Sequence, residues 1–284
     1  MSRIVYVNGD YLPEEDAKIS VFDRGFLMAD AVYEVTSIID GKMLDFPGHA
    51  TRLERSLAEI DMKQPCSMDE LEAIHRELMA RNNLTEGLIY LQVTRGVADR
   101  DFVYPDVEPT LVLFTQAKSV LHSPIAEHGM KVISIPDIRW GRRDIKTVQL
   151  LAPSMGKMAA KAAGADDAWL VGEDGFVTEG TSNNAYIVKQ DGTIVTRDLS
   201  HDILSGITRA AVLRFAAESQ IKVEERPFTI AEAQQAKEAF VTSATTFVGP
   251  VVEIDGAKIG DGKVGDTARR LREIYIAESL KTAI

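Results

Sequence analysis

W-G-R-R-D-I-K-T-V-Q-L-L, at residues 140–151, is the stretch on which the assignment of this chain depends. It places a single lysine, Lys146, among apolar neighbours that include Ile145, Val148 and Leu150. A lysine beside apolar surface can lose its proton and act as a nucleophile. The alternative is that Lys146 lays its aliphatic stem on apolar surface and keeps a solvated ammonium group.

A second stretch, T-E-G-T-S-N-N at residues 178–184, contributes the acid Glu179. A buried carboxylate can keep the ring nitrogen of a pyridoxal cofactor protonated. Lys146 and Glu179 together therefore predict a pyridoxal phosphate enzyme. Considered alone, a glutamate in such a stretch is more often an ordinary turn residue, and a lone lysine such as Lys146 is more often a solvated one.

The bulk properties of the chain narrow its class. Its 284 residues, 45% of them apolar, can form a large core without disulfide or metal support. The net charge of −11 argues against a general nucleic-acid binder, although a local arginine cluster can still bind anions. Cys66 is the single cysteine, no apolar run has the length of a membrane span, and the first ten residues lack the apolar core of a signal peptide. We therefore expect a cytoplasmic protein without a membrane or nucleic-acid partner.

Hydrophobic periodicity predicts a mixture of strands and helices. Ser67 and Glu70 have the spacing of a capping box at a helix start. Strands are predicted at residues 4–7, 31–39, 87–94, 111–115, 131–135, 167–171 and 185–188, and helices at 53–60, after 67, at 154–163, near 208 and 230, and at 264–280. Their irregular order predicts an α+β fold. Residues 117–125 carry no clear period and are placed as a linker between a smaller N-terminal α/β domain, 1–120, and a larger cofactor-binding domain, 121–284.

Two further segments are candidates for binding phosphate. L-S-G-I-T-R, at residues 204–209, lies where a loop meets a helix, and the free N–H groups of a helix start attract phosphate. Gly206 would allow close approach of the backbone, and the Thr208 hydroxyl could add a hydrogen bond. The alternative is that Thr208 is an ordinary N-cap. V-T-S-A-T-T, at residues 241–246, could complete a phosphate cup as a hydroxyl-rich loop or could be a solvated turn.

Three single residues are candidates for binding anionic groups or substrate. Arg52, on the helix after Pro47, could donate two hydrogen bonds to a phosphate, or could be a surface arginine with a packed stem. Arg100, in a loop after a strand, could clamp a carboxylate or remain a solvated charge. Tyr33 lies in a strand, where a core tyrosine is the alternative. The five histidines and one cysteine show no paired ligand spacing, so no metal site is predicted.

The order of these segments along the chain is more specific than any of them alone. They are D-R-G-F-L-M-A-D-A-V-Y-E-V (23–35), R-L-E-R (52–55), D-I-K (144–146), T-E-G-T-S-N (178–183), G-I-T-R (206–209) and V-T-S-A-T (241–245). In this order, over nearly the whole chain, they resemble the fold-type IV pyridoxal phosphate enzymes. That group includes branched-chain and D-amino acid aminotransferases and aminodeoxychorismate lyase. A-V-Y-E-V and the loop 93–100 look most like D-amino acid aminotransferases, and the resemblance implies a two-domain α+β fold.

The resemblance also implies a role for each candidate. Lys146 would form the Schiff base with pyridoxal 5′-phosphate and shuttle a proton. Glu179 would pair with the pyridine nitrogen, and Leu204 would pack on the cofactor ring. Tyr33 and Arg100 would face the substrate, with Arg100 donated by the partner subunit of a homodimer. The phosphate would be held, partly through backbone N–H groups, by Arg52, Ile207, Thr208, Ser243 and Ala244.

The implied reaction is transamination between a D-amino acid and a 2-oxo acid. An amino donor would displace Lys146, and the freed amine would take the α-proton. D-amino acid aminotransferases usually carry a histidine two places after the arginine that matches Arg100, but this chain has Phe102 there. The donor and its stereochemistry therefore stay open. Alternatives are a branched-chain L-aminotransferase, an (R)-amine aminotransferase, aminodeoxychorismate lyase and a cofactor-binding protein without turnover.

Overall fold

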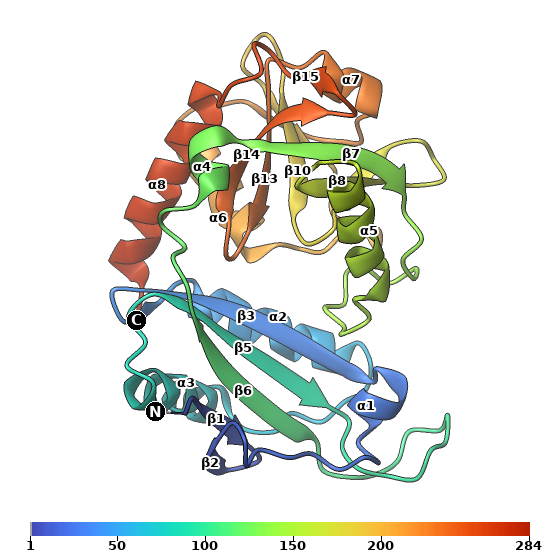
Figure 1. Ribbon diagram of the computed structural model, residues 1–284, viewed down its shortest axis with the longest axis vertical. Coiled ribbons are helices and arrows are strands. Elements are labelled where there is room, and N and C mark those ends of the chain that lie inside the picture. The colour runs from blue at the N-terminus through green and yellow to red at the C-terminus, as the bar shows by residue number, and fades with distance from the viewer. Residues whose placement is uncertain (1) are drawn as a thin grey trace. The chain divides into compact units, whose positions relative to one another are not determined.

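The computed structural model describes residues 2–284. Backbone contacts divide the chain into two compact units (Figure 1). Unit 1 contains the chain up to Val120 together with Ile145–Gln149 and Thr282–Ile284, and unit 2 contains Leu121–Asp144 and Leu150–Lys281. The segment that carries Lys146 therefore belongs to unit 1, although the residues on both sides of it belong to unit 2.

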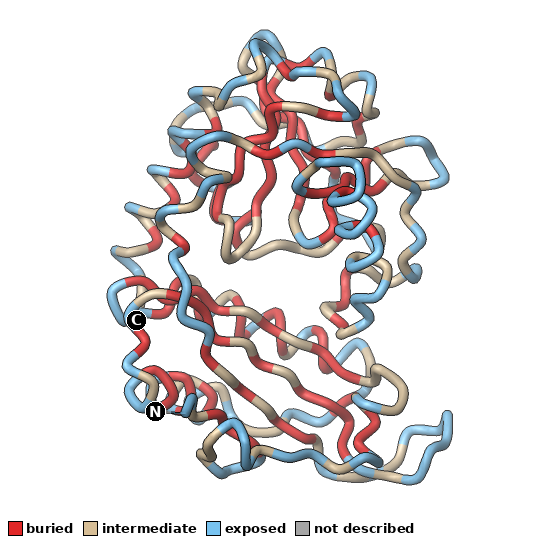
Figure 2. The backbone as a smooth tube through the Cα atoms, in the orientation of Figure 1, coloured by how far each residue is buried: buried red, intermediate tan, exposed pale blue. Residues whose placement is uncertain are grey.

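Unit 1 is built on an antiparallel sheet that, within residues 2–284, has six strands in the order β2-β1-β6-β5-β3-β4. The strands are β1 (Ile4–Val7), β2 (Asp10–Pro13), β3 (Ala31–Ile39), β4 (Lys42–Met43), β5 (Gly87–Thr94) and β6 (Thr110–Ala117). Asn8 and Gly9 form the turn between β1 and β2, as their sequence predicts. The middle strands β3, β5 and β6 are mostly buried (Figure 2).

Helices cover one face of this sheet. They are α2 (Phe46–Ala58) and α3 (Met68–Arg81), while the short helix α1 (Arg24–Met28) precedes β3. Leu53 and Leu57 of α2 share one core cluster with Leu78 of α3 and with Val32 and Leu91 of the sheet. Side chains alternate between the two faces of a strand, so Tyr33, which follows Val32, lies on the opposite face. The predicted capping box of Ser67 and Glu70 is confirmed at the start of α3.

Unit 2 contains a mixed sheet, and the described residues give it nine strands. The path is β12-β11-β10-β13-β14-β7-β8-β9, and β15 pairs with β14. The pairs β7–β8, β7–β14 and β11–β12 are parallel. The strands are β7 (Met130–Pro136), β8 (Asp167–Val171), β9 (Val177–Gly180), β10 (Asn184–Val188), β11 (Ile194–Thr196), β12 (Val223–Glu225), β13 (Glu238–Ser243), β14 (Phe247–Ile254) and β15 (Ala257–Lys258).

The helices of unit 2 surround a core that includes Trp169, Phe228 and Val241. They are α4 (Pro124–His128), α5 (Leu151–Ala162), α6 (Ile207–Glu218), α7 (Ile230–Gln234) and α8 (Asp266–Thr282). None of the helices in the described chain is both long and apolar enough to cross a bilayer.

The structure confirms the mixed α+β composition and every predicted strand, and it corrects two local predictions. Residues 241–246 are not one loop, because Val241 and Thr242 pair with Ala185 and Asn184 in the sheet and only the residues after Ser243 form a turn. Thr208 is not the N-cap of α6, because the helix begins at Ile207 and Gly206 occupies the cap position. The local structure of these two segments is determined by sheet pairing in the first and by the path of the chain into α6 in the second, not by their hydroxyl content.

Candidate functional site

The backbone of Lys146 is held against the end of β3. The N–H of Tyr33 donates to the carbonyl oxygen of Lys146 at 3.0 Å, and the N–H of Val148 donates to the carbonyl oxygen of Ala31 at 3.1 Å. The neighbouring Ile145 is buried in the core of unit 1. These contacts form an isolated β-bridge between Val32 and Thr147, and they fix where the Lys146 side chain starts.

The amine of Lys146 lies over an aromatic surface. Its Nζ is 4.2 Å from the centroid of the Tyr33 ring. Tyr33 stacks on Tyr90, and Tyr90 stacks on Phe114, with centroids 5.6 and 4.8 Å apart. Within residues 2–284 no carboxylate lies within ion-pair distance of this Nζ. Lys63, Lys157 and Lys222, by contrast, each form an ion pair with an aspartate or a glutamate. An amine over aromatic rings and without an acidic partner suits a nucleophile.

Arg52 belongs to a buried ionic cluster in unit 1. Its Nε donates to Glu34 Oε1 and its Nη2 donates to Glu34 Oε2, both at 2.8 Å. His49 Nδ1 lies 2.8 Å from Glu34 Oε2. Glu34 is only 3% exposed. Burial raises the pKa of the Glu34 carboxyl, but Arg52 and His49 outweigh this effect and hold the pKa well below its usual range.

The sequence predicted Arg52 but not its partners. The signal was present in A-V-Y-E-V, because a glutamate in a strand that packs under helices must have a buried cationic partner. Glu34 follows Tyr33 directly, so the strand presents Tyr33 on one face and the Glu34–Arg52 pair on the other.

Glu179, on β9, is 4% exposed and is surrounded by donors in unit 2. Its Oε1 accepts from Arg139 Nη1 at 2.5 Å. Its Oε2 accepts from Asn184 Nδ2 at 2.9 Å and from the Leu204 N–H at 3.2 Å. Burial raises the pKa of Glu179, and Arg139 acts in the opposite direction. The carboxylate is fixed in one orientation by these contacts.

Arg139 and Asp137, which the sequence reasoning missed, extend this network. The Asp137 side chain is fully buried and accepts from Arg139 Nε at 2.9 Å and from Arg139 Nη2 at 2.7 Å. The Thr178 hydroxyl donates to the same carboxylate at 2.7 Å. Burial raises the pKa of Asp137, but hydrogen bonds from Arg139 and Thr178 lower it overall. The spacing Asp137-x-Arg139 just before Trp140 was the available signal, but it is common in exposed turns.

Asn184 connects Glu179 to the start of α6. Its Nδ2 also donates to the Leu204 carbonyl oxygen at 2.9 Å. A Cβ at Gly206 would lie 2.2 Å from Asn184 Oδ1, so a larger residue at this cap position would have to displace the Asn184 amide. Gly206 provides no side-chain cap, and the first N–H groups of α6 have no acceptor within the helix. This leaves the N–H groups of Ile207 and Thr208 suited to an anion.

The turn after β13 lies at the same end of the sheet. Asn184 pairs with Thr242, so Ser243 is the next residue of the neighbouring strand. The Ser243 hydroxyl accepts from the Thr246 N–H at 3.1 Å and so holds the turn that contains Ala244. Unit 2 thus contains Glu179, Leu204 and four of the five predicted phosphate ligands, namely Ile207, Thr208, Ser243 and Ala244. The fifth, Arg52, belongs to unit 1.

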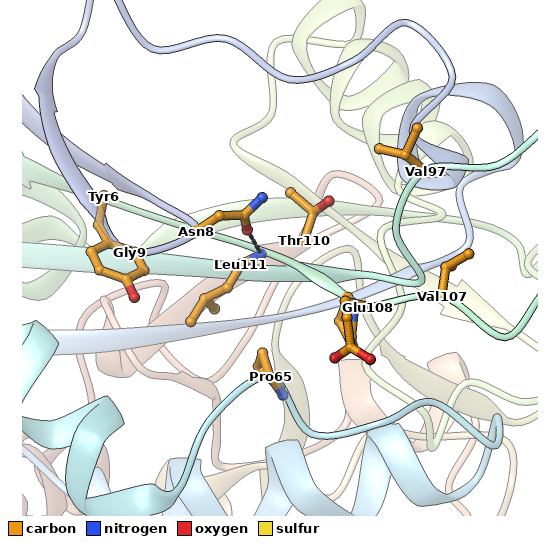
Figure 3. Close-up of a pocket in the computed structure, with 10 residues that line it drawn as sticks. Tyr6, Asn8, Gly9, Pro65, Val97, Val107, Glu108, Thr110 and Leu111 are labelled. Atoms are coloured by element: carbon orange, nitrogen blue, oxygen red, sulfur yellow. Dashed lines mark hydrogen bonds between the residues drawn. The ribbon is translucent and has the colours of Figure 1, made fainter.

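Arg100 is exposed in the loop between β5 and β6, with its guanidinium carbon 5.5 Å from the Phe102 ring centroid. No hydrogen bond or ion pair within the described chain joins it to Tyr33 or Lys146. A pocket of about 540 Å³ in unit 1 lies at the base of this loop and is lined by residues that include Tyr6, Asn8 and Glu108 (Figure 3). None of the predicted site residues lines this pocket, so it is not the predicted site.

Comparisons with known proteins identify the family of this chain. A family model described as amino-transferase class IV matches residues 31–254. The D-alanine aminotransferase of Staphylococcus haemolyticus is 37% identical over 271 residues, covering 95% of both chains. That of Listeria monocytogenes serotype 4b (strain F2365) is 37% identical over 278 residues, covering 96% of this chain and 95% of the relative.

Solved structures of branched-chain amino acid aminotransferases share the fold. The T.th. enzyme with pyridoxamine 5′-phosphate has a TM-score of 0.90 and 27% identity and covers 98% of this chain and 94% of that one. The Escherichia coli enzyme has a TM-score of 0.88 at 22% identity, covers 98% and 94% of the two chains, and shows the fold alone. The chain therefore belongs to the class IV aminotransferases, the fold-type IV family of pyridoxal phosphate-dependent enzymes.

Proposed function

We propose that the protein transfers an amino group between a D-amino acid and a 2-oxo acid. The chemistry is inferred from the Lys146 amine, which lies over Tyr33 and has no acidic partner in the described part of the chain. The preference for D-amino acids is supported by the D-alanine aminotransferases, which are 36–37% identical over 95% or more of this chain.

The residues of the chain fit pyridoxal 5′-phosphate. A lysine amine over an aromatic ring, a buried carboxylate with fixed donors and a glycine-capped helix start match its aldehyde, ring nitrogen and phosphate. When bound, the cofactor supplies an electrophilic carbon and an electron sink for the α-carbon of the substrate. Lys146 Nζ would hold the cofactor covalently and, once displaced by the amino donor, move the α-proton.

The other roles follow from charge and position. Glu179 would hold a proton on the ring nitrogen, and Arg139 and Asn184 would orient Glu179. Leu204 would pack on the ring. The phosphate would be bound by Ile207, Thr208, Ser243 and Ala244 and by the charge of Arg52, whose side chain Glu34 fixes.

Tyr33 and Arg100 would contact the substrate, and we propose that Arg100 serves the site of a second subunit in a homodimer. Support comes from exposed apolar side chains near Arg100, since Phe102 is 77% exposed and Val103 is 74% exposed. Large exposed apolar groups are typical of subunit interfaces. We also propose a cytoplasmic location, because a chain with the single cysteine Cys66 does not depend on an oxidising compartment.

Branched-chain aminotransferase activity is the second candidate, because it is the activity named for the structural relatives at 27% identity and because Phe102 replaces the usual histidine. A donor panel separates the possibilities. We expect turnover with D-alanine and 2-oxoglutarate to exceed that with L-leucine and with a simple (R)-amine. The opposite ranking would contradict the proposal. Release of pyruvate from aminodeoxychorismate without an amino acceptor would indicate a lyase, and no turnover with any donor would indicate a binding protein.

A further inference from the structure

The position of Arg100 depends on a long connection between strands. The β5–β6 loop, residues 95–109, extends beyond the strand ends in unit 1 (Figure 1). Its tip is exposed, and an unrestrained exposed loop would sample many conformations. A residue that must meet a substrate carboxylate needs a fixed location, because binding loses affinity when the loop must first be ordered.

The base of the loop is held by backbone contacts. The N–H of Arg24 donates to the Gly96 carbonyl oxygen at 2.9 Å, and the N–H of Ala98 donates to the Phe22 carbonyl oxygen at 3.2 Å. Gly96 has φ +100°, and a Cβ there would lie 2.1 Å from the Glu108 carbonyl oxygen. Val97 and Val107, from the two limbs of the loop, line the same pocket (Figure 3).

The tip of the loop is held by two arginines that share one carboxylate. Asp30 Oδ2 accepts from Arg24 Nε and from Arg95 Nε, each at 2.8 Å. Arg24 Nη1 donates to the Asp101 carbonyl oxygen at 2.5 Å. The guanidinium carbon of Arg95 lies 3.5 Å from the centroid of the Tyr104 ring. Asp101, which lies between Arg100 and Phe102, and Tyr104, two places after Phe102, are therefore anchored to one ionic cluster.

Both arginines of the cluster are buried and hydrogen-bonded. Arg24 is 1% exposed and Arg95 is 4% exposed. The remaining donors of Arg95 reach the carbonyl oxygens of Asp61 and Ile60 at 2.9 and 2.7 Å. The planar fork of arginine serves both Asp30 and the loop at once, which the single ammonium of lysine would not do.

We propose that Arg24, Asp30 and Arg95 are positioning residues that set the location of Arg100 and thereby the selectivity of the enzyme for amino donors with a carboxylate. This inference rests on the proposed role of Arg100 in binding substrate. None of the three residues touches substrate or cofactor in this scheme. Their effect is transmitted through Asp101 and Tyr104.

The test compares D-alanine with D-alaninol, in which a hydroxymethyl group replaces the carboxylate. Tyr104→Ala removes the exposed anchor without disturbing the buried cluster, and Tyr104→Phe keeps the ring over Arg95. We expect Tyr104→Ala to raise the KM for D-alanine about tenfold, with kcat and the KM for D-alaninol nearly unchanged. Tyr104→Phe should resemble the wild type. Arg24→Met, if it folds, should show the same split more strongly.

A double-variant cycle with Arg100→Ala separates positioning from stability. In the Arg100→Ala background, Tyr104→Ala should change the KM for D-alanine by less than about twofold, because both changes remove the same contact. Equal losses for both donors, or full additivity of the two substitutions, would overturn the inference.

If Arg100→Ala alone leaves the KM for D-alanine unchanged, the role of Arg100 and this inference both fail, while wild-type turnover still tests the transaminase itself. If the wild type prefers a different amino acid as donor, the same comparison is made with that amino acid and its amino alcohol in place of D-alanine and D-alaninol.

Discussion

At the scale of single residues, each predicted catalytic group depends on neighbours that hold it. Lys146 is fixed through its backbone along β3, and Glu179 is fixed through three donors from different parts of unit 2. The sequence motifs identify these two residues because their spacing is characteristic of the family. Arg139 and Glu34 were not predicted, because their partners lie 40 and 18 positions away and only the folded chain brings them together.

Lys146→Ala should abolish transamination, because no other group replaces the covalent attachment and the proton transfer. Borohydride reduction followed by peptide mass analysis should find a pyridoxyl adduct on the Lys146 peptide of the wild type and none in the variant. Lys161→Ala, an exposed lysine of α5, is the control and should keep both adduct and activity. Full turnover by Lys146→Ala would refute the assignment.

Arg139→Met should lower kcat by about tenfold to a hundredfold, because a charge-assisted hydrogen bond contributes roughly 1.5–3 kcal/mol. Loss of the guanidinium removes the interaction that opposes the burial of Glu179, so the pKa of Glu179 rises further. The acid limb of the pH–rate profile and the pH dependence of the visible absorbance should both move to higher pH. Arg226→Met, which removes the more exposed pair with Glu232, is the control. An unmoved pH profile in Arg139→Met would contradict the role of Arg139.

The buried side chain of His75 should make the free energy of unfolding depend on pH. Burial lowers the pKa of His75 from 6.5 to about 4, so the folded state prefers the neutral ring. The unfolded chain gains a proton below its own pKa of 6.5, so the free energy of unfolding falls as the pH drops from about 6.5 to about 4, by up to about 3 kcal/mol. Urea unfolding at pH 7 and pH 5 measures the loss. His75→Gln should be less stable at pH 7 but should lose less stability between the two pH values, and an unchanged slope would contradict this account.

At the scale of elements, sequence periodicity predicted the strands and the long helices well, because one buried face imposes its period on the sequence. Strand 31–39, the capping box at Ser67 and the helix after 264 are examples that the structure confirms. The structure of the hydroxyl-rich segment 241–246 was not predicted correctly, because its pairing with β10 is a long-range contact that local composition does not reveal. The start of α6 depends on a similar long-range fit, since Asn184 occupies the space beside Gly206.

Gly206→Ala should weaken cofactor binding by about tenfold or more, because the added methyl group would collide with Asn184 and displace the first turn of α6. Titration of the apoprotein with pyridoxal phosphate, followed by absorbance, measures the effect. Gly141→Ala is a matched control, because a Cβ there meets no atom within 4 Å. Equal affinities of the two variants would show that the approach at Gly206 is unimportant.

At the scale of the whole molecule, the location of Arg100 can be tested by mixing subunits. If Arg100 serves the partner's site, a heterodimer of Lys146→Ala and Arg100→Ala subunits contains one intact site. Random co-assembly of the two variants, measured with D-alanine at a concentration below KM, should then restore about a quarter of wild-type activity, although each homodimer is impaired. A mixture no more active than the average of its parents would show that Arg100 acts within its own subunit.

The segment Ile145–Gln149 also limits how this chain can be divided. A single cut between Val120 and Leu121 would leave Lys146 on one fragment and its neighbouring strand β3 on the other. The first fragment would then expose the unpaired backbone of Ala31 and Tyr33, an edge that invites aggregation. Split reporters or circular permutants of this enzyme should therefore be opened at a surface turn inside unit 2, such as Asp191-Gly192, because Ile145–Gln149 and β3 then stay on the same fragment.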